Sequence, residues 1–239
     1  MRNEIMRLAT VVAFGVATLG AGGVGAANAT VYDVVSGFSS ASNPDGVWSY
    51  SYAGALFTDN TPFNASFPEI WWTGQGIPLS AYVTQNVSGS TITTGTITVP
   101  NNTLWLDPES WSNVAVTFTA PTAGTYNIAG DFLGIDTTGN LHGVEILSNS
   151  SVVFADTIVA GETDSFSLSA SLAQGGTISF IVESPGSFGC SYCYLSTGLQ
   201  AQVSSGVPEP ATWAMMLLGF CGLGLAGFRA SLKNVARAA

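Results

Sequence analysis

The sequence predicts an all-β domain over residues 30–206, built as a two-sheet antiparallel β-sandwich. Short runs of alternating apolar and polar residues recur along it at roughly 8–12-residue spacing. Turn-forming stretches such as Pro121-Thr122-Ala123-Gly124 separate these runs, and no segment between the two ends of the chain shows helical periodicity. Many short strands with regular turns are typical of a sandwich.

The clearest strand is Ser165–Leu172, where apolar and polar residues alternate strictly. After Ala173–Gly176, the run Thr177–Val182 alternates more weakly, and we expect the two runs to form a hairpin. Thr91–Val99 is rich in Thr and Ile, with Gly95 as a candidate β-bulge. Further strands are expected at Val114 with Val116 and Phe118, Tyr126 with Ile128 and Phe132, Val144 with Ile146, Val152 to Phe154, and Leu199 with Ala201 and Val203.

The charges are distributed very unevenly. All five basic residues lie at positions 2, 7, 229, 233 and 237, so residues 30–206 contain no Lys and no Arg. Of the 15 acids, only Glu4 and Glu209 lie outside this segment, which leaves 13 within it. Without cations, the domain cannot displace the counterions of a nucleic acid or clamp phosphate groups. Binding of nucleic acids and of phosphate groups is therefore excluded for this domain. Its negative charge favours solubility and the binding of divalent cations instead.

The N-terminus has the pattern of a signal peptide over residues 1–29. Arg2 and Arg7 give a positive start, Leu8–Val24 is an apolar run, and Ala27-Asn28-Ala29 is a small-x-small cleavage site. Cleavage by signal peptidase after Ala29 would begin the mature chain at Thr30. An uncleaved N-terminal anchor is the alternative.

The C-terminus, residues 207–239, contains an extended element, an apolar helix and a basic tail. Pro208-Glu209-Pro210 stays extended because two prolines fix φ and remove donors. Residues 211–228 carry no charge and would span roughly 27 Å as a helix, enough for a thin membrane. The basic residues that follow, Arg229 first, favour a tail in the cytoplasm. We therefore expect a transmembrane helix over 211–228, and a plain membrane anchor is the alternative to a sorting signal.

This terminus also resembles a known signal. Pro208-Glu209-Pro210, Trp213-Ala214, a Gly-rich helix and Arg229 directly after it are similar to the PEP-CTERM sorting signal, in its PEPxxWA subtype. The resemblance implies an exported protein of a Gram-negative bacterium, read in the inner membrane by exosortase. It further implies release to the cell surface or the extracellular matrix, often in association with exopolysaccharide or biofilm.

A second, looser resemblance concerns the domain itself. Asn43–Tyr50, Val114–Tyr126 and Ser196–Leu199 together are similar to uncharacterised exported bacterial domains of jelly-roll, carbohydrate-binding type. These motifs are structural, so the resemblance implies a fold and assigns no site.

Residues for catalysis are scarce. His142 is the only histidine, so it would have to serve any Ser-His-Asp or Cys-His mechanism, and a zinc site with two or three histidines is excluded. Next to a loop, it is expected to be a surface or strand-end residue. We expect no catalytic residue and no cofactor, with a polysaccharide-active glycosidase or lyase as the alternative.

Carboxylates give a weak indication of calcium. Asp131 and Asp136 bracket Gly134 at a predicted strand end, and Asp107 lies two residues before Glu109. Either pair could contribute oxygen ligands to a structural Ca²⁺, although solvated loop acids are the favoured interpretation.

Cys190 and Cys193 form a C-x-x-C pair before the last predicted strand. Outside the cytoplasm such a pair is expected to be oxidised, and no thioredoxin-type context surrounds it, so we predict a local disulfide. Cys221 lies in the apolar helix.

Tryptophans give the remaining indication of a ligand. Trp48 alternates with Tyr50 and Tyr52, and Trp71 lies next to Trp72, so the last two must point to opposite faces of a strand. Exposed rings could stack on a glycan, whereas burial in the core is favoured for them. The sequence thus predicts a non-catalytic surface or matrix protein, for which carbohydrate binding through stacked rings is one hypothesis and a purely structural matrix component is a further alternative.

Overall fold

The computed structural model describes residues 29–62, 67–74, 80–108, 112–138, 140–184, 195–206 and 219–221. The described residues from 29 to 206 belong to one compact unit. Outside it, only Gly219–Cys221 of the predicted helix 211–228 are described, and they are helical. In the described part of the chain, no helix is long and apolar enough to cross a membrane.

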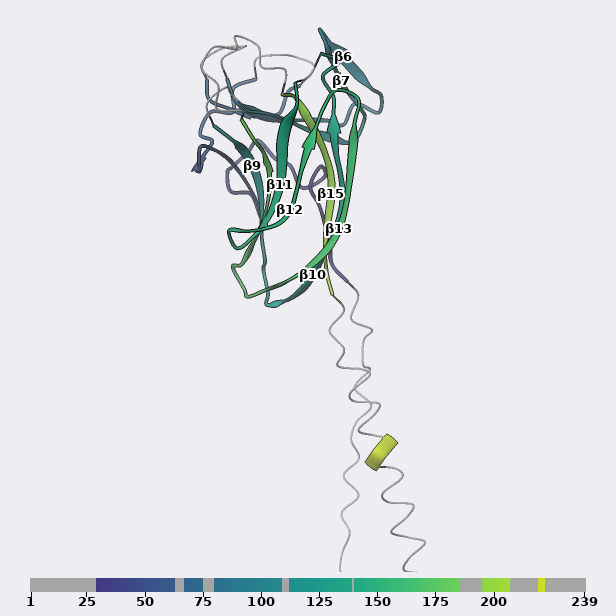
Figure 1. Ribbon diagram of the computed structural model, residues 1–239. Helices are drawn as coiled ribbons and strands as arrows, with labels where there is room; N and C mark the ends of the chain where they lie inside the picture. The colour runs from purple at the N-terminus through teal and green to yellow at the C-terminus, as the bar shows by residue number, and fades with distance from the viewer. Residues whose placement is uncertain are drawn as a thin grey trace, which may run out of the picture. The chain divides into compact units, whose positions relative to one another are not determined.

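Two antiparallel sheets face each other across one core, which confirms the predicted sandwich (Figure 1). The first sheet has the order β13-β10-β15-β8-β5-β4, and β1 pairs with the C-terminal half of β15. Its strands are β1 Val31–Asp33, β4 Ile70–Trp72, β5 Tyr82–Asn86, β8 Thr103–Asp107, β10 Gly124–Gly134, β13 Thr163–Leu172 and β15 Thr197–Ser205.

The second sheet has the order β12-β11-β14-β9-β2-β3. Its strands are β2 Trp48–Tyr52, β3 Ala55–Leu56, β9 Val114–Thr119, β11 His142–Ser148, β12 Ser151–Ile158 and β14 Thr177–Val182. The side chains that face inward are those that the alternation of apolar and polar residues predicts. Val114, Val116 and Phe118 of β9 are fully buried, as are Ile178, Phe180 and Val182 of β14.

The predicted hairpin of Ser165–Leu172 with Thr177–Val182 is wrong. These runs form β13 and β14, which lie in different sheets, β13 beside β10 and β14 between β9 and β11. The turn between them is held to the end of β9, because Gly175 donates its amide to the Ala120 carbonyl and Ala120 donates to the Gly176 carbonyl, both at 2.8 Å. The apolar faces of β13 and β14 therefore contact the same core from opposite sides.

The prediction of a β-bulge at Gly95 is also wrong. Gly95 has φ of 58° and lies in the turn of a separate hairpin, β6 Ile92–Thr94 with β7 Ile97–Val99. A left-handed conformation in a tight turn suits a residue without Cβ. The two short strands form a sheet of their own.

A second apolar cluster lies on the other face of β4, β5 and β8 and includes strand β7. Its buried members are Phe67, Ile70, Tyr82, Val99, Trp105 and Ile135. Neighbouring residues of the same strands, such as Trp71, Val83 and Leu104, face the main core instead. Because both faces of β8 are covered, its residues Thr103–Leu106 are all buried, which hides the alternation expected of a half-buried strand.

Candidate functional site

The structure buries two of the three tryptophans that were candidates for glycan stacking. Trp48 and Trp71 are 3% and 4% exposed and belong to the main core. The Trp48 indole packs against Phe118 with ring centroids 5.5 Å apart, in space that a side chain at Gly37 would occupy. The Trp71 indole N–H donates to the Ser39 carbonyl at 2.8 Å. Neither ring presents a face to a sugar, so stacking is wrong for both.

Trp72 points to the opposite face of β4, as expected from its position next to Trp71. It is half-buried and packs against the second apolar cluster. Trp72 therefore stays a candidate for contact with a ligand.

Of the calcium candidates, Asp131, Asp136 and Asp107 are described, whereas Glu109 lies outside the described residues. Asp131 lies within β10, where its Oδ1 accepts a hydrogen bond from the Ser165 hydroxyl of β13. Asp136 follows the end of β10, and its Oδ1 accepts hydrogen bonds from the amide and the hydroxyl of Thr138, both at 3.0 Å. Among the described residues, no group of three acids, histidines or cysteines is placed to hold a metal ion.

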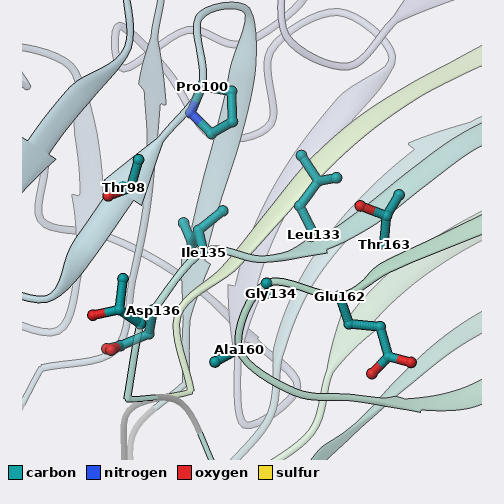
Figure 2. Close-up of a pocket in the computed structure, with 11 residues that line it drawn as sticks. Thr98, Pro100, Leu133, Gly134, Ile135, Asp136, Ala160, Glu162 and Thr163 are labelled. Atoms are coloured by element: carbon teal, nitrogen blue, oxygen red, sulfur yellow. The ribbon is translucent and has the colours of Figure 1, made fainter.

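Asp136 instead lines an open pocket of about 520 Å³ (Figure 2). Three segments far apart in the sequence form the walls: the end of β7, the end of β10 with the residues after it, and the turn from β12 to β13. The lining residues are Thr98, Pro100, Leu133, Gly134, Ile135, Asp136, Thr137, Ala160, Gly161, Glu162 and Thr163.

Backbone hydrogen bonds hold these three segments together. Gly134 donates to the Glu162 carbonyl at 2.9 Å and accepts from the Gly161 amide at 2.8 Å. The Thr98 amide donates to the Ile135 carbonyl at 2.9 Å. A Cβ at Gly134 would collide with the Val159 carbonyl, so only glycine allows this close approach. The pocket wall is therefore fixed by main-chain contacts.

The pocket combines an apolar floor with oxygen-bearing side chains. Figure 2 shows Leu133 and Ile135 above the carboxylates of Asp136 and Glu162, which lie on opposite sides of the pocket. Threonines add hydroxyl groups around them. Such a surface can contact an apolar ligand face and accept hydrogen bonds from ligand hydroxyls or amines.

A part-buried carboxylate, Asp107, lies at the end of β8. Its Oδ2 accepts hydrogen bonds from the Ser196 hydroxyl at 2.5 Å and the Tyr82 hydroxyl at 3.1 Å. Burial raises the pKa of Asp107 to about 7, against the opposing effect of these hydrogen bonds, and the negative charge of Asp136 raises it further. Asp136 thus couples the pocket electrostatically to this group.

His142 begins β11, as expected of a strand-end residue, yet it is buried. Its Nδ1 lies 2.8 Å from the Asn140 carbonyl and its Nε2 lies 2.6 Å from the Thr197 hydroxyl. Burial lowers the pKa of His142. With both ring nitrogens engaged in structural hydrogen bonds, His142 holds two strands of different sheets together.

Other predicted residues lie outside the described part of the chain. These are the cleavage-site residue Ala27, Cys190 with Cys193, and the sorting residues Pro208, Glu209, Pro210, Trp213, Ala214 and Arg229. The predicted residue Ala29 is described and precedes β1.

Comparison with protein families identifies the C-terminus. Residues 206–230 match the PEP-CTERM protein-sorting motif. This chain carries a PEP-CTERM motif. The motif implies processing by exosortase during export, as the sequence predicted. A comparison with curated proteins finds no match.

The solved structures that are similar to this chain include carbohydrate-binding modules. A family 35 module from Clostridium thermocellum is 14% identical with a TM-score of 0.31, over 75% of this chain and 100% of the module. A family 51 module from Clostridium perfringens GH95, in complex with methyl-galactose, is 13% identical with a TM-score of 0.34, over 65% and 99%. At TM-scores this low, neither module says anything about a ligand of this chain.

Proposed function

We propose that this chain is a non-catalytic, exosortase-sorted protein of a Gram-negative cell surface or extracellular matrix, whose sandwich binds a glycan in the pocket of Figure 2. Its precursor is held in the inner membrane by the helix 211–228 and loses residues 1–29 to signal peptidase. The working protein is the exported domain 30–206.

The observation that supports this most is the composition of the pocket. Leu133, Ile135 and Pro100 offer apolar contact, while Thr98 and Thr163 offer hydroxyl groups beside two carboxylates. Sugars present the matching groups, since a pyranose has apolar C–H faces and hydroxyls around its rim. An exported domain is positioned to meet an exopolysaccharide.

The experiment is a binding titration of purified residues 30–206 with soluble oligosaccharides. Ala160→Phe would fill the pocket from the turn after β12, and it should weaken binding at least tenfold. Ala155→Phe, an exposed position on β12, is the matched control and should bind normally.

A third variant tests another place in the fold. A groove of about 340 Å³ on the outer face of β10 and β15 is lined by Ala129, Asn102, Gln200 and Gln202 with Asp33. Loss of binding in Ala129→Phe with normal binding in Ala160→Phe would move the site there. No binding to any oligosaccharide would favour the structural matrix component, and release of reducing sugar would favour the glycosidase or lyase.

A further inference from the structure

We propose that the pocket of Figure 2 prefers glycans that carry a positively charged amine, such as oligomers of glucosamine, over neutral and acidic glycans. The inference rests on the glycan binding proposed above and names the ligand class of that site.

Two carboxylates reach the pocket from different segments. Asp136, only 3% exposed, comes from the residues after β10, and Glu162 comes from the turn between β12 and β13. In Figure 2 the two carboxylates lie on opposite sides of the pocket, below Leu133 and Ile135, with Gly134 and Ala160 between them. An oligosaccharide that spans the floor would therefore meet one carboxylate on each side.

Both carboxylates have uncharged protein partners. Asp136 accepts hydrogen bonds from Thr138, and Glu162 Oε2 accepts one from the Val159 amide at 3.1 Å. These bonds orient the carboxylates and leave their negative charge in place. Residues 30–206 hold no Lys or Arg that could neutralise it.

The charge of the pocket then selects among ligands. An ammonium group has three N–H donors and no acceptor, so it matches carboxylates, threonine hydroxyls and backbone carbonyls. A uronic acid or sulfated sugar would instead face two like charges in a domain with 13 acids. The described residues contain no three-ligand metal cluster that could bridge such an anion.

The test uses four β-1,4-linked tetrasaccharides titrated into residues 30–206 at low ionic strength: glucosamine, N-acetylglucosamine, glucose and glucuronic acid. We expect the glucosamine tetramer to bind at least tenfold more tightly than its N-acetylated form, and the glucuronic acid tetramer not to bind. The Glu162→Gln and Asp136→Asn variants should each lose at least fivefold in affinity for glucosamine and less than twofold for glucose.

Asp156→Asn is the matched control because it removes the same charge from an exposed position on β12, outside the pocket lining. It should change affinity for glucosamine by less than twofold. Equal loss in Asp156→Asn and Glu162→Gln, or equal affinity for the amine and the N-acetylated tetramer, would overturn the amine preference while glycan binding stood. Binding of none of the four, or of any broader panel, would instead refute the proposed function itself.

Discussion

The backbones of Thr30 and Ser205 are joined at the point where the chain enters and leaves the sandwich. Ser205 donates its amide to the Thr30 carbonyl at 2.9 Å, and the Thr30 amide donates to the Ser205 hydroxyl at 2.9 Å. Strand β1 then pairs with β15 from Val31 and Ser204 onward. The PEP-CTERM match begins at residue 206 and the predicted signal peptide ends at Ala29, so both segments adjoin this pair of strands in the sequence.

This pairing makes the signal-peptide cleavage testable. Cleavage after Ala29 would leave the first residue of the mature chain, Thr30, in contact with Ser205. We therefore predict that mass spectrometry of the exported form finds an N-terminus at Thr30. A start at Met1 would show an uncleaved anchor, and a start beyond Asp33 would remove β1 altogether and contradict the prediction.

The buried carboxylate of Asp107 should make the domain less stable as the pH rises. Its pKa of about 7 in the folded protein lies above its ordinary value of 3.8, so the folded state holds this proton more tightly than the unfolded state. The stabilisation is complete below about pH 4 and is lost as the pH rises through about 7.

The Asp107→Asn variant keeps acceptors for Ser196 and Tyr82 but cannot ionise. At pH 8 we expect it to be more stable than the wild type by roughly 1–3 kcal/mol, with little difference at pH 4. Urea unfolding at several pH values measures this. Asp156→Asn, an exposed acid, serves as the control, and a gain of the same size there would point to net charge instead of Asp107.

His142 should act in the opposite direction. Burial lowers its pKa from 6.5, so the unfolded state takes up a proton first and stability falls as the pH drops below about 6.5. In the neutral ring, Nδ1–H donates to the Asn140 carbonyl, so Nε2 is the acceptor and takes the Thr197 hydroxyl proton in competition with the Leu195 carbonyl. Nitrogen NMR at pH 8 should therefore find the Nδ1–H tautomer, and the Nε2–H form would contradict the assignment.

A pair of glycines in β10 tests the packing of the first sheet. A Cβ at Gly130 would collide with the backbone of Gln200 and Ala201 in the neighbouring β15, whereas one at Gly124 meets nothing within 4 Å. Gly130→Ala should lower the free energy of unfolding by about 2–4 kcal/mol. Gly124→Ala should change it by less than about 1 kcal/mol. Equal effects in thermal or urea unfolding would mean that β15 can shift away.

The C-x-x-C pair remains a prediction from the sequence. We expect Cys190 and Cys193 to be linked in the exported protein, since export would place them outside the cytoplasm. Alkylation followed by mass spectrometry should leave both unlabelled until a reductant is added. Labelling of both thiols without reductant would show that the disulfide is absent.

The sequence predicts strands better than it predicts their partners. The alternation in Val114–Phe118 and Ser165–Leu172 reports directly which side of each strand is buried, and both patterns hold. Alternation contains no information on which strand lies beside which. That is why the sequence predicts a hairpin of Thr177–Val182 with Ser165–Leu172, whereas the turn anchored at Ala120 takes Thr177–Val182 into the opposite sheet.

The sequence alone predicts only part of the candidate site. Asp136 could be singled out because it follows a predicted strand end, but Glu162, which lines the same pocket, comes from a turn 26 positions later. Asp107 had a usable signal, since a carboxylate ends the otherwise apolar run Leu104-Trp105-Leu106. The sequence pattern could not show that Trp48 and Trp71 are buried while Trp72 is half-buried, because it does not show which face the second apolar cluster covers.

The arrangement of β15 has a mechanical consequence. One end of the strand, Ser205, holds Thr30, and the other, Thr197, is registered with Gly134 in the pocket wall, eight residues or roughly 26 Å away. A pulling force applied between a ligand in the pocket and Thr30 or Ser205 would act along the strands. It would act on all nine registered pairs of β10 and β15 at once, in shear, and it would not peel them apart one by one.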